Sequence, residues 1–328
     1  MWIHNFLRQR QQQVRVSGHL SGKEWVTSGV PQGSVLGPLL FAILISDIDA
    51  GVLTASILTY ADDTKIFKAI EDFGDSELLQ NDLTTLFAWS CSNNQDFNAK
   101  KFESLSYSKE ALRNLYFNPS DDPIMSKDHV KDLGVTFSYD ATFDRHIDVI
   151  STKARRLAGW LLRSFMSRES GLMLTLLKQL IIPTVEYCCP VWSPTDVANI
   201  TKLEKIQRSF TKRIFGLGKV HYWDRLAQLR IFSLQRRRER YMILYLWKII
   251  QGLVPDIGLT YAPSNNNNVI KLHKPLLRGP AHAKKLMEGG LLHLGVRLYN
   301  ALPRRTCERF PLPQTKERPQ MLTASRRP

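Results

Sequence analysis

Two adjacent carboxylates, Asp62 and Asp63, lie inside an otherwise apolar, strand-like stretch that reads LTYADDTKIF. Like charges repel and carboxylates hydrate strongly, so a half-buried strand is a costly place for them. One interpretation is an acidic β-turn. The other is part of a site for a hard divalent cation, which prefers carboxylate oxygens. In both cases the pattern predicts two short strands, at 56–60 and 64–68, with the acidic pair at the tip of their hairpin.

The elements around this hairpin are predicted to mix helices and strands, which is an α+β pattern. A helix is expected near the N-terminus, followed by a hairpin that turns at Ser21-Gly22 and by a loop rich in glycine and proline. The predicted segments are a helix at 2–9, hairpin strands within 13–28, the loop Gly29–Gly33, a buried helix within 36–48, an amphipathic helix at 76–91, and strand-like pieces at 103–107 and 131–138.

Past residue 145 the apolar residues recur at helical spacing. Helices are predicted over 147–162, over 172–180 with an end near Pro183, over 200–214, and over 226–251. Residues 265–268 form a polar, low-complexity loop, and the proline- and arginine-rich tail from Pro303 is expected to be disordered.

The net charge of +15 is unevenly distributed along the chain. Residues 1–46 carry +3, residues 47–148 carry −10, and residues 149–328 carry +22. A strongly basic half is typical of a protein that binds a polyanion, with nucleic acid as the first candidate and a merely solvated basic surface as the alternative. The longest apolar run is too short to span a bilayer, and neither a signal peptide nor a CxxC pair is present. We therefore expect an intracellular protein, nuclear or cytoplasmic, with no membrane partner.

The segment SGVPQGSVLGPLLF (28–41), followed by YADD (60–63), resembles the reverse transcriptase family, and most closely the polymerases of jockey-like non-LTR retrotransposons. A second acidic pair, Asp121-Asp122, shows that two adjacent aspartates alone are weak evidence, whereas the ordered combination is specific. The resemblance continues in QDFNAKKF (95–102), KDLGVTF (131–137), EYCCPVWSP (186–194), LEKIQRSFTKRIFGL (203–217) and LYNALP (298–303), and so covers nearly the whole chain up to the tail.

This resemblance implies an α+β fold in which a partial reverse transcriptase palm is followed by an all-α thumb and a basic helical extension. The implied domains are a palm at 1–140, a thumb at 141–195, a basic helical region at 196–302 and a tail at 303–328. It also implies an RNA-directed DNA polymerase of a transposable element, which copies RNA into DNA by two-metal nucleotidyl transfer. The expected cofactor is Mg²⁺ or Mn²⁺, and the expected partners are an RNA template, a DNA primer or target, and dNTPs.

By resemblance, Asp62 is a direct metal ligand and Asp63 its weaker neighbour, while Lys101 assists departure of pyrophosphate. A plain surface lysine remains an equal alternative for Lys101, because Lys100 blurs the register. The residues expected beside the template base and the incoming nucleotide are Gly29, Pro31, Gln32, Gly33 and Tyr60. Tyr60 either stacks near the primer end or packs on a core face.

Two further groups of residues carry expected contacts with nucleic acid. Leu133, Gly134 and Val135 resemble the primer-grip hairpin of the family, although an ordinary core strand explains them equally well. In the basic half, arginines alternate with aromatic residues on one predicted helix, which suits phosphate contact with base stacking, unless the aromatics face a core and the arginines face water. The expected contacts are Lys212, Arg213, Arg236, Arg237, Arg238 and Arg240.

One catalytic part is not found in the sequence. The family needs a third carboxylate on a strand that precedes the PQG loop, Gly29–Gly33. Residues 1–27, however, contain no aspartate, and Glu24 lies in no matching context. We therefore expect an N-terminally truncated chain, lacking the fingers and the first catalytic strand, that is inactive on its own. The alternative is a catalytically dead retroelement remnant that acts only as a basic nucleic-acid-binding protein.

Overall fold

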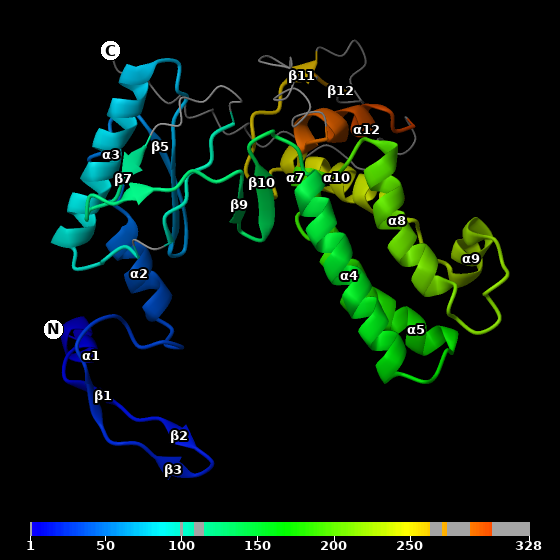
Figure 1. Ribbon diagram of the computed structural model, residues 1–328, viewed down its shortest axis with the longest axis horizontal. Coiled ribbons are helices and arrows are strands. Elements are labelled where there is room, and N and C mark those ends of the chain that lie inside the picture. The colour runs from blue at the N-terminus through cyan, green and yellow to red at the C-terminus, as the bar shows by residue number, and fades with distance from the viewer. Residues whose placement is uncertain (1, 99–100, 108–114, 263–270, 274–288, 304–328) are drawn as a thin grey trace. The chain divides into compact units, whose positions relative to one another are not determined.

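The structure is a computed structural model of the 328-residue chain. It describes residues 2–98, 101–107, 115–262, 271–273 and 289–303 (Figure 1). The chain divides into two compact units: unit 1 is Met1–Ser104 with Leu112–Ser126, and unit 2 is Leu105–Ala111 with Lys127–Pro328. Each unit is described by itself.

Unit 1 begins with a short helix and two small antiparallel ladders. The turn between β2 and β3 is Ser17-Gly18, whose φ angles of 48° and 88° are those that a tight two-residue hairpin requires. The predicted helix and hairpin are therefore present, but the turn predicted at Ser21-Gly22 is wrong, because the residues with left-handed backbone lie four positions earlier. The elements are α1 (Trp2–Leu7), β1 (Arg10–Gln12), β2 (Arg15–Val16), β3 (His19–Leu20) and β4 (Glu24–Val26), with β1 paired to β4.

The rest of unit 1 holds the acidic hairpin and its support. Pro38 lies in the first turn of α2, where a missing N–H costs nothing. A carboxylate at Asp72 caps α3, whose apolar face packs on Ile124 through Leu83 and Phe87. The elements are α2 (Gly37–Ile45), β5 (Ser56–Tyr60), β6 (Asp63–Phe67), α3 (Phe73–Ser92), β7 (Tyr116–Phe117) and β8 (Pro123–Ile124). The predicted strand at 103–107 is wrong, since that segment has only one bridge, between Ser104 and Ser126.

Unit 2 starts with a hairpin and continues as packed helices. The strand-like piece predicted at 131–138 is a complete hairpin, because Leu133 and Gly134 have φ angles of 44° and 86° and turn the chain. The helix predicted to end near Pro183 continues through it, since Pro183 lies in the first turn of α6 after a π-helical turn. The elements are β9 (His129–Asp132), β10 (Val135–Ser138), α4 (Asp144–Ser164), α5 (Ser170–Leu176), η2 (Leu177–Ile181), α6 (Ile182–Glu186) and α7 (Cys189–Trp192).

The single helix predicted over 226–251 is two helices. Arg230, with φ of 52°, ends α9, and the Ser233 side chain accepts a hydrogen bond from the Arg236 N–H to begin α10. The remaining elements are α8 (Val197–Thr211), α9 (Tyr222–Leu229), α10 (Leu234–Ile250), β11 (Tyr261–Ala262), β12 (Lys271–Leu272), η3 (Leu291–Gly295) and α12 (Val296–Asn300). The loop at 265–268 and the tail beyond residue 303 lie outside the described residues.

The main hydrophobic core of unit 2 runs from Val135 in β10 to Leu234 at the start of α10. A smaller cluster joins α10 to η3 and α12 through Leu246, Ile249 and Val296. Helices on both sides of residue 195, where the predicted thumb ends, therefore share one core. The β9–β10 hairpin belongs to the same unit. Within the described residues, no helix is both long enough and apolar enough to cross a bilayer.

Candidate active site and nucleic-acid interface

The β5–β6 hairpin places the acidic pair as predicted. Tyr60 pairs with Asp63 at the end of the ladder, and the turn is Ala61-Asp62, with φ of 53° at Ala61. Both aspartate side chains are exposed, so two neighbouring carboxylates project from a hairpin tip into solvent. Tyr60 is 67% exposed, which disfavours the interpretation of this ring as a core residue.

Asp82, on α3, holds the chain at the entrance to this hairpin. Its carboxylate accepts hydrogen bonds from the N–H groups of Leu53 (2.9 Å), Thr54 (2.9 Å) and Ala55 (2.7 Å), and from the Thr54 hydroxyl (2.6 Å). Burial by itself raises the pKa of Asp82, but these hydrogen bonds to the charged form outweigh burial and lower the pKa. β5 begins at Ser56, directly after the anchored residues. Asp82 is thus a positioning residue for the hairpin that the sequence analysis missed.

The donor set is too small for a complete two-metal site. Asp62 and Asp63 supply two adjacent carboxylates, and within the part of the chain that the structure describes no group of three His, Cys, Asp or Glu residues could hold a metal ion. Mg²⁺ at a nucleotidyl-transfer site is held by one or two carboxylates together with substrate phosphates and water, so this pair could supply the protein ligands of one ion but not of a pair of ions. The residues present therefore do not fit the catalytic metal pair.

The backbone of the PQG loop has a defined turn conformation. Gly29 and Gly33 have φ angles of 73° and 80°, which only glycine adopts without strain, while Pro31 is half-buried and Gln32 is exposed. The Arg10 guanidinium donates to the carbonyls of Ser28 (3.2 Å) and Gly29 (2.5 Å), so β1 anchors the start of the loop. Arg10 is a supporting residue that the sequence analysis did not identify.

Ser34 closes the end of the PQG loop. Its hydroxyl donates to the Pro31 carbonyl at 2.7 Å and accepts from the Gly37 N–H at 3.1 Å, at the first turn of α2. Lys101 is exposed, and its N–H donates to the Asn98 carbonyl in a turn (2.9 Å), while Lys100 lies outside the described residues. The role predicted for Lys101 stays a prediction.

The residues expected to form a primer grip lie in unit 2. Tyr187 donates its hydroxyl hydrogen to the Leu133 carbonyl (3.0 Å), and a Cβ at Gly134 would lie 3.0 Å from Cε1 of the same ring. The positive φ and the close ring both require glycine at this position. Val135 is 3% exposed and belongs to the core. The segment therefore contains both a turn that requires glycine, at Leu133 and Gly134, and the first residue of a core strand, Val135.

The basic residues expected to contact nucleic acid differ in exposure. Lys212, Arg213, Arg236 and Arg240 are exposed, and Arg236 lies over the ring of Phe232 at 5.0 Å. These four cations are free of the core and available to a polyanion.

Two arginines of the predicted set have other roles. Arg237 is half-buried and donates to Glu186 through Nε (2.5 Å) and Nη2 (2.9 Å), and this hydrogen-bonded pair raises the pKa of Arg237. Arg238 is 1% exposed, because it lies on the same helical face as the buried residues Leu234 and Met242. Burial lowers the pKa of Arg238 and removes this residue from the set of candidate nucleic-acid contacts.

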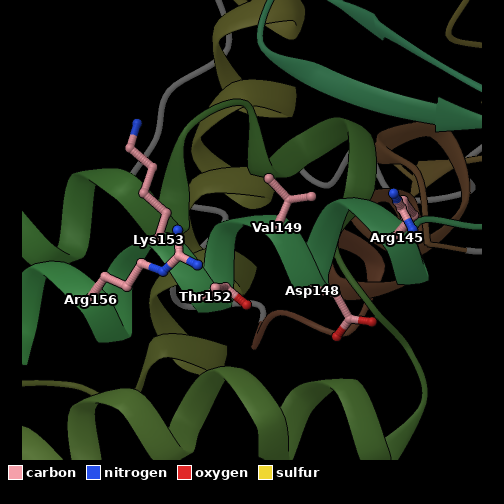
Figure 2. A pocket seen from close by; sticks show the side chains of 6 residues that line it. All are labelled: Arg145, Asp148, Val149, Thr152, Lys153 and Arg156. Carbon is pink, nitrogen blue, oxygen red and sulfur yellow. The ribbon is translucent and has the colours of Figure 1, made fainter.

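A further basic surface lies on α4. Figure 2 shows a surface hollow in which Arg145, Lys153 and Arg156 project from this helix. Asp148 lines the same hollow and forms an ion pair with Lys202 of α8 (2.5 Å). The sequence analysis did not assign these cations, although Arg145, Lys153 and Arg156 recur at near-helical spacing, which is the signal that could have found them.

Comparison with known proteins shows which family and which relatives the chain resembles. Residues 1–137 match the family "Reverse transcriptase (RNA-dependent DNA polymerase)". The chain is 27% identical over 222 residues to "Probable RNA-directed DNA polymerase from transposon X-element" of Drosophila melanogaster, which covers 65% of this chain and 24% of that protein. It is also 27% identical over 226 residues to "RNA-directed DNA polymerase from mobile element jockey" of the same organism, with 65% and 25% covered.

These similarities reach past the family match, because 65% of the chain exceeds 137 of 328 residues. The matched region spans about a quarter of the length of each of these two polymerases. No solved structure matches the chain. Residues 1–137, which include the PQG loop and the acidic hairpin, are thus similar to the reverse transcriptase family.

Proposed function

We propose that the chain is part of an RNA-directed DNA polymerase of a non-LTR mobile element. It contributes the Asp62–Asp63 pair of the catalytic site, together with a basic helical region that holds nucleic acid. The observation that carries this proposal is the β5–β6 hairpin, which presents both carboxylates at an exposed tip inside the segment that matches the family. The substrates are an RNA template, a DNA primer or target, and dNTPs, and the cofactor of the whole enzyme is Mg²⁺ or Mn²⁺.

The finer assignments belong to the same proposal. The PQG loop and Tyr60 contact the template base and the incoming nucleotide, Lys101 assists the leaving group, and the β9–β10 turn contacts the primer. The palm comprises 1–140, the thumb 141–195, the basic helical region 196–302 and the tail 303–328. The exposed glycine backbone of the PQG loop supports this reading, because it lets a base pair approach closely.

Alone, the chain is proposed to bind nucleic acid without extending a primer. Two adjacent carboxylates hold a cation weakly and in a poorly defined geometry, which misplaces the reacting atoms. The small donor set also favours a second candidate function, a catalytically dead remnant that acts only through nucleic-acid binding. Sequencing the transcript upstream of the Met1 codon separates the two. An upstream segment in the same reading frame that encodes a predicted strand with an Asp-x-x-x-x-Phe-Asp signature indicates the polymerase. A stop codon or an unrelated sequence indicates the remnant.

The binding part of the proposal is tested with the full chain and a fluorescent primer–template duplex. Affinity should fall steeply as salt rises, because bound cations release counterions from the phosphates. In the double variant Arg236→Ala/Arg240→Ala, the slope of log K against log[salt] should become less negative by roughly 1 to 2. The matched control is Arg8→Ala/Arg15→Ala in unit 1, where the slope should stay unchanged. Salt-independent or absent binding would overturn the proposal.

A further inference from the structure

The connection between α8 and α9 carries the most exposed aromatic side chain among the described residues. Phe215 is 86% exposed, whereas its neighbour Ile214 is 3% exposed and packs in the main core of unit 2. Leu217, two residues further on, packs against the same core. Phe215 is therefore held outside between two anchored apolar residues.

The turn that presents Phe215 is fixed by its backbone. The Phe215 N–H donates to the Arg168 carbonyl at 2.9 Å, and the Leu217 N–H donates to the Ile214 carbonyl at 3.1 Å. Gly216 has a φ of 76°, and a Cβ there would meet no atom of the described residues beyond its chain neighbours within 4 Å, so the space beside this glycine is open. A single exposed apolar residue needs no explanation by itself, so the side chains around Phe215 decide whether this surface can bind a ligand.

The surroundings are basic. Between Lys205 and His221 the chain has five lysines and arginines and no aspartate or glutamate. Lys212, Arg213 and Lys219, which flank Phe215, are all exposed. A rigid ring inside a cluster of cations is complementary to a ligand that offers both a flat apolar face and negative charges.

The connection between α4 and α5 adds to the same surface through its hydrogen bond to Phe215. Its Arg168 donates from Nη2 to the Leu162 carbonyl at 2.7 Å and from Nη1 to the Phe165 carbonyl, so this cation is held close to its own backbone. In the same connection Met166 is 87% exposed, and Glu169 is the one acidic residue. The two connections together present apolar groups and positive charge at one end of the helices.

We propose that the Lys212–Lys219 turn is a stacking site for single-stranded nucleic acid. The ring of Phe215 stacks on an unpaired base, while Lys212, Arg213 and Lys219 contact the flanking phosphates. Bases inside a duplex are already stacked on one another and do not offer a face to the ring, so the site selects single strands. The inference rests on the proposed nucleic-acid partner of the chain and adds a specific site and the class of strand that it takes.

The test uses the full chain, a fluorescent 12-nucleotide oligo(dT) and the matching dT·dA duplex, with dissociation constants measured by anisotropy. Phe215→Leu keeps an apolar side chain but removes the flat ring, and it should weaken oligo(dT) binding roughly 5- to 150-fold. Duplex binding should change less than about twofold. Phe215→Trp should retain oligo(dT) binding, and Trp25→Leu, an exposed aromatic of unit 1, is the matched control that should leave both affinities unchanged.

Four results would overturn the inference. If wild-type chain binds both probes and Phe215→Leu leaves oligo(dT) affinity unchanged, the stacking site is wrong while the proposed function stands. An equal loss for single strand and duplex would mean that the ring does not read an unpaired base. Binding to phosphatidylserine vesicles that Phe215→Leu weakens, with no binding of oligo(dT), would assign the surface to a membrane. If wild-type chain binds neither probe, the proposed function fails as well.

Discussion

His146 makes the stability of unit 2 depend on pH. It lies at the start of α4, is 2% exposed, and packs its ring edge-on against Trp192 with the centroids 5.1 Å apart. Its Nδ1 accepts a hydrogen bond from the Thr136 N–H of β10 (3.2 Å), so the neutral ring carries its proton on Nε2. Nε2 is buried and has no hydrogen-bond partner among the residues that the structure describes. Protonation of Nδ1 would therefore break the link between β10 and α4 and place a charge in the core.

The magnitude follows from the pKa of this imidazole. Burial lowers the pKa of His146 from its ordinary 6.5 to about 4. Between these values the unfolded chain binds more protons than the folded chain, so the free energy of unfolding decreases as the pH falls through 6.5. From pH 8 to pH 5 the loss is about 2 kcal/mol, and below pH 4 it levels off at about 3 kcal/mol.

The assay is urea unfolding at pH 8 and at pH 5, with the His146→Gln variant as the matched control. A glutamine carbonyl can accept the Thr136 hydrogen bond and does not titrate, so the variant should lack this pH dependence. Other titrating groups contribute equally to both proteins and cancel in the comparison. Wild type should lose about 2 kcal/mol more than the variant between the two pH values. Equal losses in the two proteins would refute the reasoning.

Three further predictions concern positioning and packing. Asp82→Ala removes the acceptor of three part-buried backbone N–H groups and should lower the free energy of unfolding of unit 1 by about 1–3 kcal/mol in urea titrations; less than about 0.5 kcal/mol would contradict the anchor. Gly134→Ala strains a positive φ and crowds Tyr187, so thermal unfolding should show a loss of about 1–3 kcal/mol, and an unchanged midpoint would argue against the close contact. Glu186→Gln removes the charged partner of Arg237 and should cost about 1–2 kcal/mol, whereas the same change at the exposed Glu77 should cost nothing measurable; equal effects would exclude the pair.

The parts of the fold that were predictable from the sequence are those with strong local patterns. The acidic hairpin was confirmed because strand-forming residues flank a turn on both sides, and α4 was confirmed because its apolar residues recur at helical spacing over about four turns. The break between α9 and α10 was missed, since Arg230 is not a residue type that marks a helix end, and its left-handed backbone is set by the packing around it. The turn at Ser17-Gly18 was missed because a second Ser-Gly pair follows four residues later.

The candidate site shows the same division between local and long-range information. Asp62 and Asp63 were identified from a short motif in an ordered set of motifs. The support from Asp82 depends on contacts 27 to 29 residues away in the chain, which no local pattern reveals, although its position between Leu79 and Leu86 places it on the buried face of α3. Arg238 was predicted to contact nucleic acid because its neighbours are basic. It is buried instead, because it lies on the helical face that packs into the core.

We propose that this chain carries a nucleic-acid-binding surface and two of the catalytic carboxylates but does not polymerise alone. Primer extension on poly(rA)·oligo(dT) with dTTP and Mg²⁺, run beside binding to the same duplex, tests the claim directly. We predict salt-sensitive binding with no incorporation of dTMP. Incorporation that disappears in Asp62→Ala would contradict the claim, because it would show that the residues present complete an active site.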